Sequence, residues 1–392
     1  MKQVELRSGI YYVGAVDWSV RNFHGYITNR GATYNAYLIL DEKVALVDTT
    51  KEPFGEELID RIREIIDPEK IDYVISNHVE PDHSGALPKV MEHAKNAVVV
   101  TSAPCGVSGL TAYYGQYQFY PVKAGDTISL GKRSLTFVTT PMLHWPDNMV
   151  TYCPEEKILF SNDAFGQHYA SSFHFDDEVD LSEVYHEAKK YYANILMLYG
   201  KQALKALEVV GSLELEMIAP SHGVIWRSHV SEILRLYQQY AQGKVEEKAV
   251  IVYDSMWHST EIMARHILEG FAKAEVTVKL FDLKVNHCSD IVTEVLDAKY
   301  IAIGSPTLNN QVMPTVAAFL AYLKGLAPTE KIGFAFGSYG WNGNSIKIIE
   351  QAMHEMGIIP MFEPWKQVYV PTKEELWEIE ERICTWIQKN RE

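Results

Sequence analysis

The segment His78-Val79-Glu80-Pro81-Asp82-His83 follows an apolar stretch, residues 71–75, that has the composition of a buried strand. Its six residues include two imidazoles and two carboxylates, and each of these groups can bind a metal ion. Burying so many polar groups beside a strand is costly unless they are paired or coordinated. The segment therefore predicts a metal site at the end of a strand.

Three further potential ligands lie at long intervals, each in a turn-like setting after apolar residues. They are His144 in Met-Leu-His-Trp-Pro, Asp163 in Phe-Ser-Asn-Asp-Ala and His222 in Pro-Ser-His-Gly. The complete set holds four His and three acids: His78, Glu80, Asp82, His83, His144, Asp163 and His222. One metal ion takes roughly four to six ligands, so two ions that share a bridging carboxylate fit these groups better than one ion.

The first segment resembles the metallo-β-lactamase pattern His-x-His-x-Asp-His with one change, because Glu80 stands where that pattern has its second His. Nitrogen-rich ligand sets suit zinc, whereas mixed sets of imidazole and carboxylate with open positions suit iron. The change therefore indicates redox chemistry rather than hydrolysis.

The composition is that of a soluble globular protein with more than one domain. The chain has 392 residues, and a domain has about 100–200, so we expect two domains. Apolar residues make up 47% and charged residues 22%, which is enough to build substantial cores. The formal net charge of −15 would repel phosphates, so we expect no nucleic-acid partner.

Cysteine usage and the start of the chain bear on the compartment. The four cysteines form no Cys-x-x-Cys pair, which argues against a disulfide framework and against an iron–sulfur cluster. The first residues lack the apolar core of a signal peptide, and no run reaches the ~18 apolar residues of a membrane span. We expect a cytoplasmic protein without a membrane partner.

A polar stretch, residues 241–248, interrupts the apolar patterns and predicts two domains, 1–246 and 247–392. The first domain starts with strands, and helices enter later, which predicts an α/β sandwich of two sheets between helical layers, in the order αββα. Its expected elements include strands at 10–16 and 34–40 and a helix at 181–198. In the second domain five strands alternate with five helices, the last strand at 368–370, which predicts a doubly wound parallel sheet.

The loop Asp254-Ser-Met-Trp-His-Ser-Thr260 lies between the first strand and the first helix of the second domain. Backbone N–H groups at such a helix start can hold an anion, and the loop adds hydroxyl donors without positive charge. A helix cap alone would also explain Ser259 or Thr260. The residues predicted to contact a ligand here are Ser255, Met256, Trp257, His258, Ser259 and Thr260.

Two more polar loops follow the third and fourth strands of the same domain and therefore leave the same edge of the sheet, where open α/β sheets bind ligands. Their predicted contact residues are Pro306, Thr307, Leu308, Asn309, Asn310, Ser338, Tyr339, Gly340 and Trp341. Tyr339 and Trp341 offer flat faces for a ring system. A phosphate loop together with these aromatic rings predicts a site for flavin mononucleotide (FMN), and the chain has neither Gly-x-Gly-x-x-Gly nor a P-loop motif.

With both halves considered, the chain resembles the flavodiiron proteins, also called A-type flavoproteins, over essentially its whole length. The resemblance rests on His-x-Glu-x-Asp-His at residues 78–83 and on the signatures around His144, Asp163 and His222. It implies a metallo-β-lactamase-like domain with two non-haem irons and a flavodoxin-like domain with FMN.

The resemblance also implies a role for each ligand. One iron is expected on His78, Glu80 and His144, the other on Asp82, His83 and His222, and Asp163 is expected to bridge them. Family members differ over whether the residue at His83 reaches its iron. His24 and His174 are candidate catalytic residues that orient ligands or donate protons.

The family reduces dioxygen to water, nitric oxide to nitrous oxide, or both. The resemblance implies an external electron donor, rubredoxin or a similar small redox protein, while some relatives use reduced coenzyme F420 directly. It further implies a head-to-tail homodimer, or a dimer of dimers, that brings the FMN of one subunit to the iron site of the other.

Two other functions remain open from the residues alone. A dinuclear zinc hydrolase with an accessory flavodoxin domain would explain the His-x-x-x-Asp-His remnant, but Glu80 argues against it. An electron carrier or oxygen sensor with a vestigial metal site is the second alternative, and the intact set of seven ligands argues against it.

Overall fold

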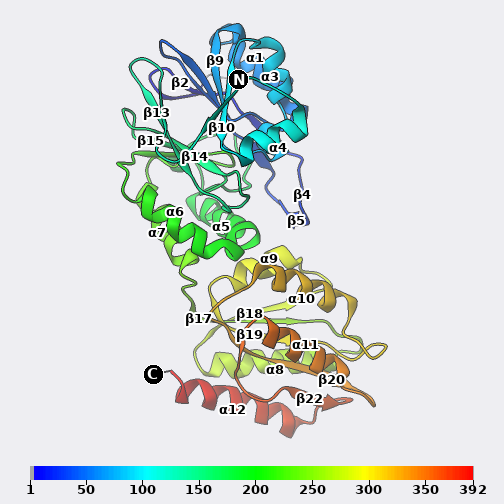
Figure 1. Ribbon diagram of the computed structural model, residues 1–392. Helices are drawn as coiled ribbons and strands as arrows, with labels where there is room; N and C mark the ends of the chain where they lie inside the picture. Colours follow the sequence, from blue (N-terminus) through cyan, green and yellow to red (C-terminus); the bar gives the residue numbers. More distant parts are fainter. Residues whose placement is uncertain (1–3, 392) are drawn as a thin grey trace. The chain divides into compact units, whose positions relative to one another are not determined.

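Two compact units make up the structure (Figure 1), a computed structural model that describes residues 4–391. The first unit comprises the residues up to His24, Thr28–Tyr191 and Lys201–Gln238, and the second comprises Gly25–Ile27, Tyr192–Gly200 and the residues from Gln239 onwards. The predicted boundary after residue 246 thus lies inside the second unit, at the start of strand β17 (Glu246–Tyr253).

The first unit is built on two main sheets. The larger has the strand order β1-β2-β7-β8-β9-β10-β11, and the smaller has the order β12-β13-β14-β15-β16. The strands of the larger sheet are β1 Val4–Arg7, β2 Ile10–Tyr12, β7 Tyr37–Ile39, β8 Val44–Val47, β9 Ile71–Ser76, β10 Val98–Ser102 and β11 Phe119–Val122. Those of the smaller are β12 Thr127–Ser129, β13 Ser134–Thr139, β14 Met149–Cys153, β15 Ile158–Asn162 and β16 Met217–Pro220. The remaining short strands are β3 Ala15–Asp17, β4 Asn22–Phe23, β5 Tyr26–Ile27 and β6 Ala32–Tyr34.

The two sheets pack face to face. One buried cluster joins Tyr37 and Ile75 of the larger sheet to Phe137 and Phe160 of the smaller. A second cluster lies on the other face of the larger sheet, which is covered by helices. The helices of this part are α1 Gly55–Arg63, α2 Pro81–Ser84, α3 Leu87–His93, α4 Cys105–Tyr114, α5 Leu181–Tyr191, α6 Gly200–Val210 and α7 Val230–Ala241. The predicted sandwich is confirmed.

Two predicted elements of this domain differ in detail. The strand expected at 10–16 is divided into β2, which pairs with β7, and β3, which pairs with β6 in a separate sheet. Gly14 lies between them, where a Cβ would be 2.4 Å from the Tyr34 carbonyl oxygen. The helix expected at 181–198 is an α-helix only as far as the end of α5. It continues as a π-helix, Tyr192–Leu196, and then as a 3₁₀-helix, Met197–Tyr199. Its apolar residues continue without a break, so periodicity alone did not reveal the change.

The second unit is a parallel sheet with the strand order β18-β17-β19-β20-β21, and β22 also pairs with β20. Its further strands are β18 Thr277–Asp282, β19 Ala298–Gly304, β20 Ile332–Tyr339, β21 Ile359–Pro360 and β22 Trp365–Val368. Its helices are α8 Ser259–Lys273, α9 Cys288–Val295, α10 Pro314–Leu326, α11 Asn344–Glu355 and α12 Lys373–Lys389. In β17, Val250 belongs to one buried cluster and Ile251 to another, so helices cover both faces as predicted.

The last strand was predicted at the wrong residues. The structure places it at Trp365–Val368, where Phe336 pairs with Trp365 and Tyr339 with Val368. Val368 and Val370 are apolar but exposed, which made 368–370 resemble a strand in the sequence.

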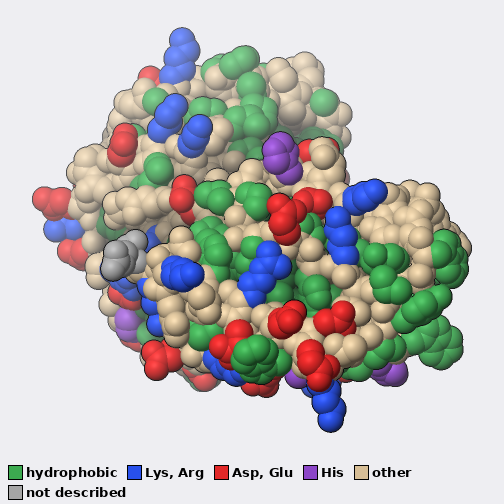
Figure 2. Space-filling view, turned by 90° about the horizontal axis from the view of Figure 1, so that it is seen from below, with side chains coloured by type: hydrophobic (Ala, Val, Ile, Leu, Met, Phe, Trp, Pro, Cys, Tyr) green, Lys and Arg blue, Asp and Glu red, His purple; other side chains and the backbone are tan. Residues whose placement is uncertain are grey.

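The surface mixes charged and apolar groups. Figure 2 shows one face on which acidic, basic and hydrophobic side chains are interspersed. Among residues 4–391, no helix has both the length and the apolar character needed to cross a membrane.

Candidate functional site

The predicted metal ligands lie in segments that follow strands of the two packed sheets. His78 and Glu80 follow β9, and Asp163 directly follows β15. The seven side chains form two groups in which potential ligand atoms lie within 4.8 Å of one another. The first group is His78, Glu80, His144 and Asp163, and the second is Asp82, His83 and His222. The structure therefore brings together residues that are up to 144 positions apart in the sequence, from His78 to His222.

The first group surrounds a small space between Glu80 and Asp163. Glu80 Oε2 lies 3.2 Å from His144 Nε2 and 3.3 Å from His78 Nε2. Asp163 Oδ2 lies 3.5 Å from His144 Nε2 and 3.8 Å from His78 Nε2. The imidazole nitrogens and carboxylate oxygens thus converge from four sides.

The second group is arranged in the same way. Asp82 places Oδ2 3.2 Å from His222 Nε2 and Oδ1 3.4 Å from His83 Nε2. The other oxygen of Asp163, Oδ1, lies 2.9 Å from His83 Nε2 and 3.6 Å from His222 Nε2. Each oxygen of Asp163 therefore faces a different group, as expected of a bridging carboxylate.

The donor set fits two metal ions. Two ligand atoms that are each about 2.1 Å from one ion lie roughly 3.0–3.4 Å apart when the angle between them is 90° to 109°. The four separations from Glu80 and Asp82 lie in this range, and the four from Asp163 lie between 2.9 and 3.8 Å. Several of the converging atoms are buried and make no hydrogen bond to any of residues 4–391: both carboxylate oxygens of Asp82, Asp163 Oδ2, His78 Nε2 and His222 Nε2. Such atoms are costly to bury without a partner, and a metal ion would be that partner.

The electrostatics of the site favour cations. Burial lowers the pKa of His78, but its hydrogen bond to Asp147 and the nearby Glu80 carboxylate outweigh this and raise that pKa to about 10. Burial likewise opposes the charge of His83, and the attraction of Asp82 and Asp163 raises its pKa to about 9. Carboxylates that hold protons on buried imidazoles so strongly provide the negative charge that two metal ions require.

Three residues that the sequence did not single out fix the orientation of the ligands. His78 Nδ1–H donates to Asp147 Oδ2 at 2.9 Å, and His222 Nδ1–H donates to the Thr33 carbonyl oxygen at 2.7 Å. Both bonds leave the Nε2 atoms to face the site. The Tyr191 hydroxyl donates to Asp163 Oδ1 at 2.7 Å. Asp147 could have been found, because it follows His144 by three residues in a polar turn.

A buried carboxylate, Asp48, connects the loops that carry the ligands. Its side chain accepts hydrogen bonds from the backbone N–H and the amide of Asn77 at 2.8 and 3.0 Å. It also accepts from the Asn162 amide at 3.4 Å and from the Ser221 hydroxyl at 3.3 Å. These three donors are the residues directly before His78, Asp163 and His222, so one carboxylate holds three ligand loops.

The two candidate catalytic histidines lie in different places. His24 Nε2–H donates to Glu80 Oε1 at 2.6 Å, and its side chain is 70% exposed, so it joins the first ligand group to the surface. His174 stacks on Tyr12, with ring centroids 4.3 Å apart, and none of its described contacts involves a ligand. A histidine that the sequence did not single out, His168, lies closer, 5.0 Å from the His222 ring, and burial keeps its pKa well below the usual value.

His174→Phe is expected to reduce the loss of stability in acid while gas turnover persists. Burial, with a smaller contribution from Arg61, lowers the pKa of His174 to about 4, whereas the unfolded chain has about 6.5. Since the unfolded state then binds more protons, His174 makes the protein less stable as the pH falls from 6.5 towards 4, by about 3 kcal/mol in total. The measurement is the denaturation midpoint of both proteins from pH 7.5 to 4.5. Identical pH profiles, or lost turnover at neutral pH, would contradict this structural role.

The phosphate loop of the second unit runs from the end of β17 to the start of α8. Ser255 is buried and its hydroxyl has no hydrogen-bond partner among the described residues, so it is available to a ligand. The Thr260 hydroxyl lies 3.1 Å from that of Ser338, which joins this loop to the loop after β20. Trp257 and His258 are exposed, and His258 pairs with Glu261 at 2.8 Å.

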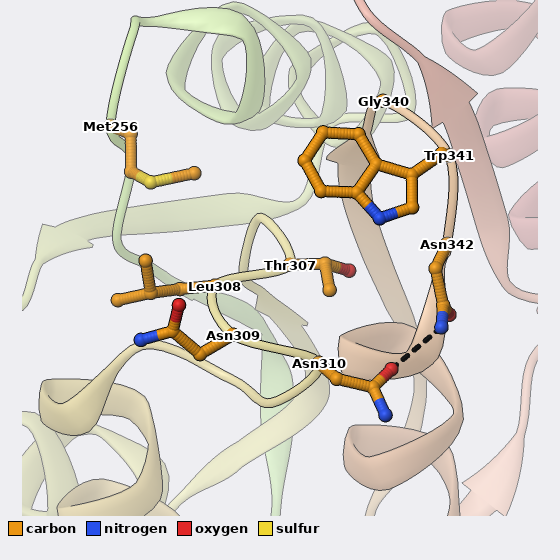
Figure 3. A pocket seen from close by; sticks show the side chains of 8 residues that line it. All are labelled: Met256, Thr307, Leu308, Asn309, Asn310, Gly340, Trp341 and Asn342. Atoms are coloured by element: carbon orange, nitrogen blue, oxygen red, sulfur yellow. Dashed lines mark hydrogen bonds between the residues drawn. The ribbon is translucent and has the colours of Figure 1, made fainter.

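A cavity of about 480 Å³ lies between the three loops (Figure 3). It is lined by Met256, Thr307, Leu308, Asn309, Asn310, Gly340, Trp341 and Asn342. In Figure 3 the ring of Trp341 lies across the cavity from the Met256 side chain, as walls on either side of a flat ring system would. Asn342, which was not predicted, donates to Asn310 Oδ1 at 2.6 Å. The other predicted loop residues do not line this cavity but belong to the loops that border it.

Two protein-family models match the chain. The model described as "ODP family beta lactamase" matches residues 32–223, and the model described as "Flavodoxin" matches residues 251–376. A β-lactamase-type unit with a carboxylate-rich two-metal site, joined to a flavodoxin unit, defines a metal- and flavin-dependent oxidoreductase.

Whole-length relatives support this class. The chain is 48% identical over 380 residues to the nitric oxide reductase of Moorella thermoacetica, and the match covers 95% of each chain. It is 45% identical over 380 residues to the rubredoxin-oxygen oxidoreductase of Megalodesulfovibrio gigas, covering 95% and 94%. The crystal structure of the flavodiiron protein from Giardia intestinalis matches with a TM-score of 0.95 and 36% identity, covering 100% of this chain and 98% of that one.

The chain belongs to the flavodiiron protein family, whose cofactors are FMN and a pair of non-haem irons. The predicted resemblance, fold class and cofactors are thereby confirmed.

Proposed function

We propose that this protein reduces dioxygen, nitric oxide or both, with electrons that pass from an external donor through FMN to a di-iron site held by the seven predicted ligands. The observation that carries the proposal is the position of Asp163, whose two oxygens face two separate ligand groups. The names of the relatives, a nitric oxide reductase and a rubredoxin-oxygen oxidoreductase, support the same two substrates.

When bound, the irons provide two adjacent redox centres and FMN provides a store of two electrons. The chain's own residues prepare that chemistry. Glu80, Asp82 and Asp163 offset the positive charge of the metal ions and so favour their oxidised state. The Tyr191 hydroxyl oxygen lies 2.7 Å from Asp163 Oδ1, and His24 Nε2 lies 2.6 Å from Glu80 Oε1, so each holds a proton next to a ligand carboxylate from which it can be delivered to the product.

The zinc hydrolase alternative is less well supported. Glu80 Oε2 lies within 3.3 Å of two imidazoles, so a carboxylate occupies a position that a third imidazole would take in a nitrogen-rich zinc set. The relatives named above are oxidoreductases.

Several finer features of the proposal come from the family resemblance. We expect rubredoxin or a similar small protein as the donor, with reduced coenzyme F420 as an alternative donor. We also expect a cytoplasmic protein that works as a head-to-tail homodimer or a dimer of dimers, since the iron site of one subunit would then receive electrons from the FMN of the other. The solution mass and the rate with each donor test these points.

The purified protein is expected to contain about two irons and one FMN per chain, because two ligand groups and one flavin cavity are built into it. It should consume dioxygen or nitric oxide when reduced rubredoxin is supplied. Metal analysis, flavin absorbance and parallel gas-electrode traces with the two gases measure this. A matched sample loaded with zinc serves as the control and should consume neither gas.

Zinc in the purified protein, together with hydrolase activity and no gas consumption, would overturn the proposal. Iron and FMN in the expected amounts with no consumption of either gas would favour the electron carrier or sensor instead.

A further inference from the structure

The loop predicted to hold the FMN phosphate, residues 254–260, starts at a buried acidic residue. Asp254 lies at the end of β17 and is only 1% exposed. Its Oδ1 accepts the Ser255 N–H at 2.6 Å, and its Oδ2 accepts the hydroxyl of Thr315. A carboxylate in this position repels a second anion, and a phosphate monoester carries close to two negative charges.

No Lys or Arg side chain within the loop offsets that charge. Residues 254–260 contain no Lys or Arg. The one imidazole, that of His258, is exposed and bonds to Glu261 at 2.8 Å, an acid outside the loop. Hydroxyl and N–H groups can bind phosphate oxygens, but they leave the repulsion from Asp254 in place.

Lys284 reaches this position from the neighbouring strand. Strands β17 and β18 are parallel, and Tyr253 pairs with Asp282, so the turn after β18 lies beside the start of the phosphate loop. The backbone N–H of Lys284 donates to Asp282 Oδ1 at 2.9 Å, which fixes that turn. Its ammonium group lies 3.3 Å from Asp254 Oδ1 and donates to the carbonyl oxygen of Ser255.

From this geometry we infer that Lys284 is the residue that makes the flavin site selective for the phosphorylated flavin, by neutralising Asp254 and holding the first carbonyl of the phosphate loop. The inference rests on the FMN site of the proposed function and adds a specificity role to it. Lys284 is a positioning residue, because its ammonium group is bound to protein oxygens and acts on the phosphate through Asp254 and the loop.

The effect should depend on the charge of the ligand. FMN and riboflavin share the ring system and differ in the phosphate. Removing Lys284 should therefore lower the affinity for FMN and leave the affinity for riboflavin unchanged. A surface ion pair without this role would leave both affinities unchanged, and the 47% exposure of the Lys284 side chain makes that outcome a real alternative. If the role of Lys284 were purely structural, its removal would lower the affinity for both flavins equally.

The test is a fluorescence titration of flavin-depleted full-length protein with FMN and, separately, with riboflavin. Lys284→Met is expected to raise the Kd for FMN by about tenfold, as the loss of a charge-assisted hydrogen bond does, with no change for riboflavin. Lys284→Arg should retain the preference for FMN. Lys279→Met removes an exposed charge from the same strand and is the matched control, expected to change neither Kd.

A second variant tests the cause. If Lys284 acts by neutralising Asp254, adding Asp254→Asn to Lys284→Met should return the FMN Kd to within about threefold of wild type, because the two sites are coupled. Three results would overturn the inference: an equal loss of affinity for both flavins in Lys284→Met, no loss of affinity for FMN in that variant, or no recovery of FMN affinity in the double variant. Wild-type protein that bound neither flavin would contradict the FMN site itself, a result that differs from all of these.

Discussion

Asp163→Ala is expected to remove both metal ions from the protein while the flavin stays bound. Asp163 Oδ2 faces His78 and His144, and Oδ1 faces His83 and His222, so its loss takes a ligand from both groups at once. It also leaves four imidazoles with fewer anionic partners, so their mutual repulsion would increase. The flavin cavity is lined by residues of the second unit, which has its own hydrophobic clusters.

The measurement for Asp163→Ala is iron per chain beside flavin absorbance. We expect less than about a tenth of the wild-type iron, since a bridging ligand serves both ions, and an unchanged flavin content. Asp163→Asn keeps the shape and one acceptor oxygen and should retain part of the metal. Glu208→Ala, which removes an exposed acid from α6 in the same unit, is the control and should retain all of it. Loss of flavin together with the iron would contradict the independence of the two sites.

Asp48→Ala is expected to disorganise the metal site without removing any ligand. The substitution removes the common acceptor of Asn77, Asn162 and Ser221, and leaves their buried donors without it. The neighbouring Thr49 also holds the carbonyl oxygen of His83, with its hydroxyl at 2.6 Å and its N–H at 2.9 Å. Leaving several buried donors unsatisfied costs at least about 3 kcal/mol.

Two readings check Asp48→Ala: iron content and thermal unfolding followed separately from flavin release. Both the iron content and the midpoint temperature of unfolding of the first unit should fall. Asp48→Asn should give values between those of Asp48→Ala and wild type. Asp41→Ala is a matched control, because the Asp41 carboxylate also accepts several backbone N–H bonds, from Glu42, Lys132 and Arg133. It should lower stability without lowering iron content. Full iron content in Asp48→Ala would rule out the organising role.

The residues that form the two groups of potential ligands could be singled out because each lies in a short segment with a recognisable chemical pattern. Apart from Asp147, the residues that orient them could not, because their bonds join distant parts of the chain. Asp48 bonds to residues 114 and 173 positions away. A lone Asp after an apolar strand has no local signature of that role, and its positive φ of 54° is visible only in the structure.

The fold shows the same division between local and distant information. The alternation of strands and helices in the second unit is a local pattern, and it led to the correct class. The position of β22 depends on its pairing with β20, a distant partner, and exposed valines beside it misled the prediction. Helices α4 and α6 and strands β11 and β16 were not predicted.

The carboxylate of Asp48 has a consequence for how this sequence can diverge. Its three partners are residues that precede proposed ligands in separate loops, and the side chains of all three donate to the same oxygen, Asp48 Oδ2. A change at position 48 removes the acceptor shared by the other three, and a change at any of those three leaves Asp48 with fewer donors. Positions 48, 77, 162 and 221 are therefore expected to covary among homologues as one set, although none of them belongs to the seven proposed ligands.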